Sequence, residues 1–215
     1  MKLYIGNRNY SSWSLRVWLT LKVKRVDFEE DLRPFDVENN YADFFEFSPT
    51  GKVPVLEVGD QVIWESLAIL EHMAEEYPDR QFWPESRTTR SHARAVAQEM
   101  HAGFVALRAA CPMNMRRKIE ALPVDAAVRR DVARVEAIWQ DCFERYGGPY
   151  LFGTEFGIAD GMYAPIVNRL QIYALSTAPA VLKYTDTLTR LEPWQAWAKD
   201  AAAESWVLDI DEVYA

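Results

Sequence analysis

The spacing of apolar and polar residues changes about a third of the way along the chain. The first part alternates short apolar runs, typical of strands, with segments whose apolar residues recur at helical spacing. The runs on either side of Gly59-Asp60 predict a hairpin. The predicted order is strand, helix, strand, helix, hairpin and helix, over residues 2–6, 14–23, 26–32, 41–47, 53–58 with 61–64, and 66–77.

The second part has no convincing strand pattern and consists of long, alanine-rich amphipathic segments. Prolines and the pair Gly147-Gly148 mark the expected stops, with Pro193 as the last of them. Between the two parts, Pro78 and Pro84 bound a stretch without a sustained period, as expected of a linker. The predicted helices cover residues 87–111, 125–146, 158–174 and 179–191.

This order of elements predicts an α/β domain of thioredoxin-like topology followed by an all-α helical bundle. The first crossover makes parallel strand neighbours, and the hairpin adds an antiparallel edge. We place the first domain at residues 1–78, the linker at 79–86 and the helical domain at 87–215.

Composition and charge narrow the class of protein. The chain has 215 residues, 49% of them hydrophobic and 26% charged, as in an ordinary globular protein. A net charge of −8 disfavours a nucleic-acid partner, and no apolar stretch has the length needed to cross a membrane. Cys111 and Cys142 lack the spacing of a metal site or disulfide framework, so we expect no metal and a reducing, cytoplasmic location.

Three loops of the first domain carry candidate chemistry. Ser11, Ser12 and Ser14 stand where a strand gives way to a helix, a place whose free amides and dipole favour an anion. A serine hydroxyl there can donate to a thiolate and lower the pKa of a bound thiol. The alternative is that these serines only cap the helix, which the segment taken alone favours.

The second and third loops fit a peptide ligand. A cis bond before Pro54 would turn the backbone of Val53 outward to pair with an extended ligand, whereas a trans proline opening an edge strand is the commoner arrangement. Glu65 and Ser66 stand where a strand becomes a helix, and together they suit the ammonium and carboxylate of an amino acid. Ser66 alone is more often an N-cap.

Taken together, the three loops carry a resemblance to the glutathione transferase family. The sequence resembles that family over nearly its whole length. Residues 11–17 are similar to the zeta-class pattern of two serines, cysteine, serine, any residue and arginine. The resemblance implies glutathione as co-substrate, with Val53 at its cysteinyl backbone and Glu65 and Ser66 at its γ-glutamyl end. It implies Ser11 or Ser12 at the sulfur, with Ser11 favoured by the zeta pattern and Ser12 by counting back from Arg16. Trp13, Lys52 and Pro54 complete the expected glutathione site.

The chain departs from the family pattern at two positions. Trp13 stands where the zeta class has its active-site cysteine, which argues against zeta-type isomerisation, and the absence of cysteine from this loop disfavours thiol transfer. Gly157 stands where the capping box before Asp160 usually has serine or threonine, a change that costs a few tenths of a kcal/mol. Asp160 is then structural.

We expect the second substrate between the sheet edge and the first bundle helix. The candidate lining residues are mostly apolar, and Arg108 is the one suited to a carboxylate, although such an arginine is more often paired or solvated. The predicted function is conjugation of glutathione to an apolar electrophile; the alternatives are a maleylacetoacetate-type isomerase and a non-catalytic glutathione-binding or assembly module. The resemblance also implies a homodimer. The candidate residues are Tyr10, His101, Phe104, Arg108 and Met113, with Met100, Pro112 and Cys111 nearby.

Overall fold

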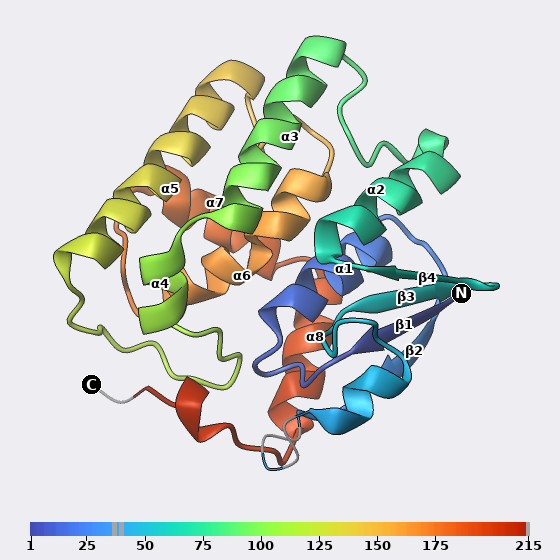
Figure 1. The fold of residues 1–215 in the computed structure, drawn as a ribbon. Helices are drawn as coiled ribbons and strands as arrows, with labels where there is room; N and C mark the ends of the chain where they lie inside the picture. Colours follow the sequence, from blue (N-terminus) through green and yellow to red (C-terminus); the bar gives the residue numbers. More distant parts are fainter. Residues whose placement is uncertain (36–37, 39–40, 214–215) are drawn as a thin grey trace.

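A four-stranded mixed sheet forms the centre of the first half of the protein. The computed structural model describes residues 1–35, 38 and 41–213. The strand order is β2-β1-β3-β4, with β1 parallel to β2 and antiparallel to β3, and with β3 and β4 forming the hairpin (Figure 1). The strands are β1 (Lys2–Ile5), β2 (Glu29–Leu32), β3 (Val55–Val58) and β4 (Gln61–Trp64).

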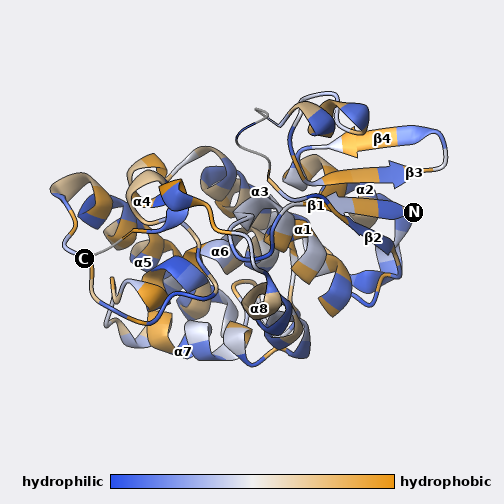
Figure 2. Ribbon diagram, turned by 90° about the horizontal axis from the view of Figure 1, so that it is seen from below, coloured by the Kyte–Doolittle hydropathy of each residue, from blue (hydrophilic) through white to orange (hydrophobic). Residues whose placement is uncertain are grey.

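The helices of this half complete the predicted thioredoxin-like arrangement. Both α1 and α2 pack against α6 of the second half, so they lie between the sheet and the helical bundle (Figure 1). Hydrophilic residues lie at the β3–β4 turn, farthest from the bundle, and the hydrophobic residues of β4 lie nearer to it (Figure 2). The elements are α1 (Ser12–Val23), η1 (Ala42–Glu46), α2 (Ser66–Glu76) and η2 (Pro78–Arg80).

The second half is helical throughout its regular elements, as predicted. No helix in the described part of the chain has the length and apolar character needed to cross a membrane. The elements are α3 (Arg87–Ala102), α4 (Val105–Ala110), α5 (Ala126–Tyr146), α6 (Ile158–Ile172), α7 (Pro179–Thr189), α8 (Glu192–Ala203) and η3 (Asp209–Asp211).

The predicted helix over residues 87–111 is two helices in the structure. The break falls at Gly103, which has extended dihedrals, and Phe104, whose φ is +56°. The apolar spacing continues across this break because Met100, Phe104 and Leu107 all face the core. A periodic pattern therefore hid a change of direction that brings α4 beside the cleft.

Helix α8 is absent from the predicted elements, which end at residue 191 because Pro193 is expected to stop a helix. Proline lacks an N–H, but the first turn of a helix has no partner for that N–H, so proline is tolerated there. Pro193 is the second residue of α8. The helix packs on α1 through Trp197, whose ring centroid lies 5.0 Å from that of Trp18 and whose Nε1 donates to the carbonyl of Arg8 at 2.9 Å.

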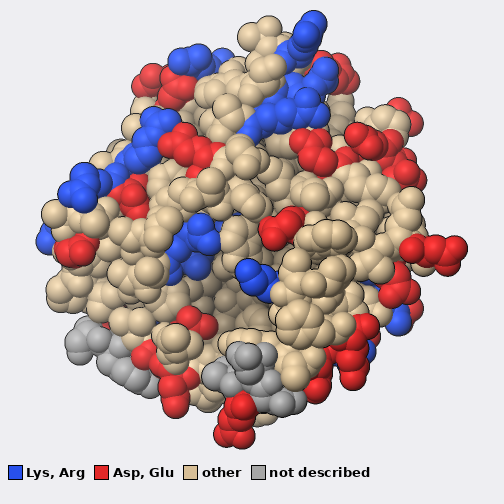
Figure 3. All heavy atoms as spheres, in the orientation of Figure 1, with Lys and Arg blue, Asp and Glu red and all other residues tan. Residues whose placement is uncertain are grey.

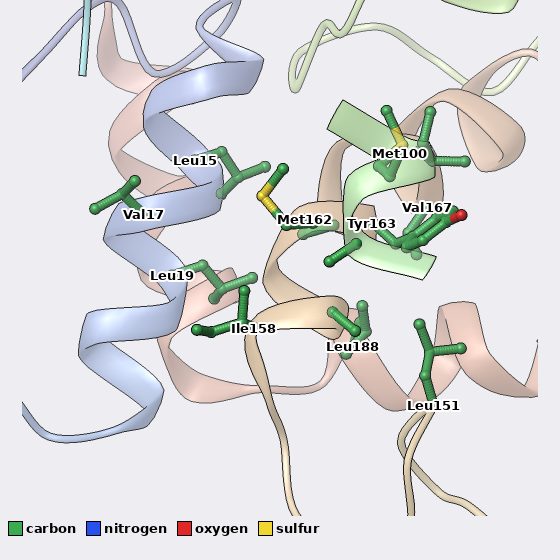
Figure 4. Packing of buried hydrophobic residues seen from close by; sticks show 14 of the residues in the cluster. Leu15, Val17, Leu19, Met100, Leu151, Ile158, Met162, Tyr163, Val167 and Leu188 are labelled. Carbon is green, nitrogen blue, oxygen red and sulfur yellow. The ribbon is translucent and has the colours of Figure 1, made fainter. Parts of the chain in front are cut away.

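The two halves are joined mainly where α1 packs on α6. Leu15 and Leu19 of α1 point toward Met162 and Ile158 of α6 in a shared hydrophobic core (Figure 4). The helices come closest at Gly161, where an added Cβ would lie 1.9 Å from Thr20 Oγ1 and 3.1 Å from the Arg16 carbonyl oxygen. Glycine is therefore required at this crossing for reasons of space.

The start of α6 is fixed by Asp160, as expected. Its Oδ2 accepts from Gly157 N at 2.8 Å, and its Oδ1 accepts from Leu151 N at 3.0 Å and from the Tyr184 hydroxyl at 2.7 Å. Burial raises the pKa of this carboxyl to about 6, although these three donors favour its charged form. A Cβ added at Gly157 would lie 3.2 Å from the Phe82 carbonyl oxygen, which is a tighter contact than most side chains make.

The α1–α6 crossing makes a direct prediction about stability. Gly161→Ala should lower the free energy of unfolding by about 1–3 kcal/mol, because the new methyl group forces the helices apart. Urea denaturation of wild type, G161A, T20A and the double variant measures the effect. The cost of G161A should be smaller in the T20A background, where the hydroxyl and methyl of Thr20 are gone; an equal cost in both backgrounds contradicts the proposed crowding.

Candidate functional site

Ser11 is the N-cap of α1 and is buried, with 4% of its surface exposed. Its Oγ donates to Ser14 Oγ at 2.7 Å and accepts a long bond from Ser14 N at 3.4 Å. Ser14 Oγ in turn accepts from Gly6 N at 3.1 Å, so the chain of hydroxyls is anchored to the end of β1. The one proton of the Ser11 hydroxyl is therefore engaged within the protein.

Ser12 differs from Ser11 in position and bonding. It is the first residue of α1 and is partly exposed, and its hydroxyl has no hydrogen-bond partner in the described part of the chain. Both serines stand at the positive end of the α1 dipole. The Ser12 hydroxyl can donate to a ligand as it stands, whereas the Ser11 hydroxyl would first have to give up its bond to Ser14.

A polar cavity of about 320 Å³ joins the first half to the helical half. Its walls include Arg108 and His101, which come from α4 and α3. The cavity brings together all six residues predicted to bind glutathione outside the serine pair: Trp13, Lys52, Val53, Pro54, Glu65 and Ser66.

An apolar cavity of about 450 Å³ adjoins it on the serine side. Trp13, Thr50, Lys52 and Val53 line both cavities and form their common wall. The remaining lining residues are Tyr10, Ser11 and Ser12 at the start of α1, four aromatic residues (Phe35, Tyr41, Phe44 and Phe45), Gly51, and Leu208, Ile210 and Asp211 near the end of the chain.

The bond between Val53 and Pro54 is cis. Among the described residues, neither the N–H nor the carbonyl of Val53 has a hydrogen-bond partner. Both groups are available to a ligand lying along the start of β3.

Glu65 holds a left-handed conformation, with a φ of +68°, directly before α2. Its carboxylate is exposed and lies 3.8 Å from Nε2 of His101. Burial lowers the pKa of His101, so at neutral pH this ring is uncharged and leaves the charge of Glu65 uncompensated. Ser66 is buried, and its hydroxyl donates weakly to Met162 Sδ at 3.9 Å.

Trp13 is packed against two arginines. The guanidinium carbon of Arg16 lies 3.8 Å from the centroid of the indole ring, and that of Arg108 lies 4.9 Å from it. Arg16 is fully buried, its Nε donates to the Met162 carbonyl at 3.0 Å, and its two terminal nitrogens lack partners among the described residues. Burial lowers the pKa of Arg16, and the neighbouring charges of Arg169 and Arg108 lower it further.

The residues expected to hold the second substrate are divided. Tyr10 lines the apolar cavity, whereas His101 and Arg108 line the polar one. Phe104 and Met113 line neither cavity and are buried in the hydrophobic core. These two residues therefore contribute to core packing and do not line either cavity.

Met100, Pro112 and Cys111 are buried as well. Cys111 lines neither cavity, and burial raises the pKa of its thiol to about 11. In the described residues there is no group of three His, Cys, Asp or Glu side chains placed to hold a metal ion.

The segment after α8 was not anticipated as part of the site. Glu212 Oε1 accepts from the Tyr10 hydroxyl at 2.6 Å, and Arg116 Nη2 donates to the same hydroxyl at 2.8 Å. Arg116 also donates to the carbonyls of Glu204 and Trp206, so the segment is held by Arg116 of the second half and, through Glu212, by Tyr10 of the first half. Nothing in the sequence spacing links Glu212 to Tyr10, so this wall is visible only in the structure.

The molecule is hollowed between its two halves, and basic and acidic groups both border the hollow (Figure 3). The cleft is therefore a place of mixed charge on a chain whose net charge is −8. This suits a ligand that carries charges of both signs.

Comparison with known families agrees with this geometry. Residues 10–76 match the model of the glutathione S-transferase N-terminal domain, and residues 91–200 match that of the C-terminal domain. The chain belongs to the glutathione S-transferase family. The transferase fold predicted from the sequence, a thioredoxin-like domain followed by a helical bundle, is confirmed.

Relatives of this chain include a probable maleylacetoacetate isomerase and a transferase of the zeta class. A probable maleylacetoacetate isomerase of Caenorhabditis elegans is 31% identical over 189 residues, covering 86% of this chain and 87% of that protein. A zeta-class glutathione S-transferase of Euphorbia esula is 25% identical and covers 95% and 92% of the two chains. A crystal structure of a Burkholderia glutathione transferase homologue with bound glutathione has a TM-score of 0.70 at 22% identity, covering 94% of this chain and 98% of that one.

The different bonding of the two serines predicts different effects on stability. Ser11→Ala should lower the free energy of unfolding by about 1 kcal/mol, because it removes an N-cap and the bond to Ser14. Ser12→Ala should change it by less than about 0.5 kcal/mol, because no bond is lost. Urea denaturation of both variants checks this; an equal loss in the two would show that Ser11 does not cap α1.

Proposed function

We propose that this protein is a glutathione transferase in which a hydroxyl of the Ser11–Ser12 pair stabilises the thiolate of glutathione for attack on an apolar electrophile. The observation that carries the proposal is the common wall of the two cavities. Residues suited to a tripeptide line one side, an apolar chamber lies on the other, and the serine pair opens onto that chamber.

In this proposal glutathione lies along the polar cavity. Its cysteinyl backbone pairs with the free N–H and carbonyl of Val53, with Lys52 and Pro54 beside it. Its γ-glutamyl ammonium pairs with Glu65, and the start of α2 at Ser66 lies next to it. The sulfur then reaches past Trp13 toward the serines.

The reaction is nucleophilic substitution or addition at the electrophile. The thiol proton leaves to solvent, the thiolate forms a carbon–sulfur bond, and with a chlorinated nitroaromatic the carbon–chlorine bond breaks with chloride carrying away the electron pair. The serine hydroxyl and the α1 N-terminus each stabilise the thiolate by about 1–3 kcal/mol in a desolvated site. Each 1.36 kcal/mol lowers the pKa of the thiol by about one unit.

A second candidate is glutathione-dependent cis-trans isomerisation of the maleylacetoacetate type. The double serine and the similarity to the probable maleylacetoacetate isomerase of Caenorhabditis elegans favour it, and Trp13 in place of cysteine opposes it. An assay with maleylacetoacetate as substrate tests this candidate. If the protein binds glutathione but does not turn over maleylacetoacetate, the isomerase function is excluded. Binding measured by calorimetry, without turnover of any electrophile, would instead favour the non-catalytic module.

We also propose that the protein is cytoplasmic and forms a homodimer. Each chain has a glutathione-binding domain at residues 1–78, a linker at 79–86 and a helical domain at 87–215. Light scattering tests the dimer, since a particle mass equal to the 24.8 kDa chain would exclude it.

Serine substitution tests the main proposal. Removing the donor hydroxyl should lower kcat/KM with glutathione and 1-chloro-2,4-dinitrobenzene by about 10- to 100-fold, because a charge-assisted hydrogen bond is lost. It should also raise the pKa seen in the pH profile of kcat/KM. Ser11→Ala and Ser12→Ala are compared with Ser91→Ala, an exposed serine on α3.

The identity of the donor follows from which variant shows the loss. A loss in S12A would assign the free hydroxyl, and a loss in S11A would assign the hydroxyl now bonded to Ser14. If S11A, S12A and the double variant all keep wild-type rates, neither hydroxyl activates the thiol.

A further inference from the structure

Arg108 lines the polar cavity and forms no ion pair with any acidic side chain of the described residues. Its Nη1 donates to the carbonyls of Gly103 at 3.1 Å and of His101 at 3.5 Å, at the end of α3. No carboxylate of the described residues lies within ion-pair distance of it. Half-buried arginines are normally paired, so an unpaired one facing a cavity indicates an anionic ligand.

The position of Arg108 is fixed by Trp13. Cation–π contact with the indole ring and the two carbonyl bonds leave the guanidinium little freedom. The ring is itself held against the fully buried Arg16. Trp13, at the position of the zeta-class cysteine, therefore orients an arginine from the helical half toward the cavity.

Arg108 and Glu65 place opposite charges in the same cavity. Glu65 comes from the first half and Arg108 from the second, and His101 of α3 lines the same cavity. An amino-acid end group carries an ammonium and a carboxylate on one carbon, so it offers one group for the acidic residue and one for the basic residue of this cavity. The Ser66 hydroxyl, expected to hold the carboxylate, is instead buried against Met162.

We propose that Arg108, oriented by Trp13, binds the α-carboxylate of the γ-glutamyl residue of glutathione opposite Glu65. This inference rests on the proposed binding of glutathione, although not on the proposed reaction. A carboxylate of the electrophile fits Arg108 less well than the carboxylate of glutathione does. The electrophile must meet the sulfur in the apolar cavity, beside the serines. Arg108 lines the polar cavity and does not line the apolar one. Glutathione would then bridge the two halves of the protein.

Calorimetry with two ligands tests this assignment. The ligands are glutathione and 4-aminobutyryl-cysteinylglycine, which lacks only the carboxylate in question. Arg108→Gln should weaken glutathione binding about tenfold or more and leave the affinity for the analogue within twofold of wild type. Arg108→Lys should recover part of the affinity, because it keeps the charge without the planar fork.

Two controls separate the role from general effects. Arg130→Gln, an exposed residue of α5, makes the same charge change and should alter neither affinity. Thermal unfolding of R108Q checks that the variant is folded, and Trp13→Phe, which keeps an aromatic ring beside Arg108, should lose less glutathione affinity than R108Q.

The assignment is overturned if R108Q weakens both ligands equally, since the carboxylate would then play no part. A second outcome also overturns it, in which R108Q leaves the affinity for glutathione unchanged. In that outcome R108Q raises the KM for 4-chloro-3,5-dinitrobenzoate, which carries a carboxylate, but not the KM for 1-chloro-2,4-dinitrobenzene. Arg108 would then bind the electrophile. Wild-type protein that binds glutathione with the expected dependence on Arg108, but shows no turnover, refutes the proposed reaction alone. No binding by wild type refutes both proposals.

Discussion

Helices α1 and α6 approach so closely at Gly161 that no side chain separates them there. This contact sets the angle and distance between the sheet half and the helical half. The cleft lies where the start of α1 meets α3, α4 and the segment after α8, so its walls come from both halves. A shift of one helix across the other would move Arg108 relative to Glu65 and would change the spacing of the opposite charges in the cleft.

The same helix carries the chemistry at its first turn. Ser11 and Ser12 begin α1, Trp13 covers Arg16 one turn later, and Arg16 is bonded to α6 through the Met162 carbonyl. A buried guanidinium without an acidic partner is costly, and here it lies beneath a site suited to an anion. The position, polarity and packing of the site are therefore linked within the first two turns of one helix.

The sequence was sufficient for the order of strands and helices, because short apolar runs and 3.6-residue periods are local signals. It was also sufficient for the capping role of Asp160. It failed at Phe104, where the apolar period continues through a left-handed residue, and at Pro193, where a helix start was taken for a stop. At Phe104 the same apolar spacing fits one long helix or two shorter ones, and at Pro193 the proline fits the end of one helix or the start of another. Tertiary packing selects between these alternatives.

The site itself was only partly accessible from sequence. The loop residues near Val53 and Glu65 follow from turn and strand ends, but the bond that engages the Ser11 proton, the orientation of Arg108 and the wall formed by Leu208 depend on contacts across the fold. These contacts join residues that no periodicity relates.

The segment after α8 gives the apolar chamber a wall of its own. Leu208 and Ile210 border that chamber and do not border the polar cavity, and the segment is fastened to Arg116 and Tyr10 rather than to the sheet. Substitutions at Leu208 or Ile210 can therefore widen or narrow the apolar cavity without replacing any side chain that lines the polar cavity. Substrate range and thiol binding are, in this architecture, separable traits that can diverge independently.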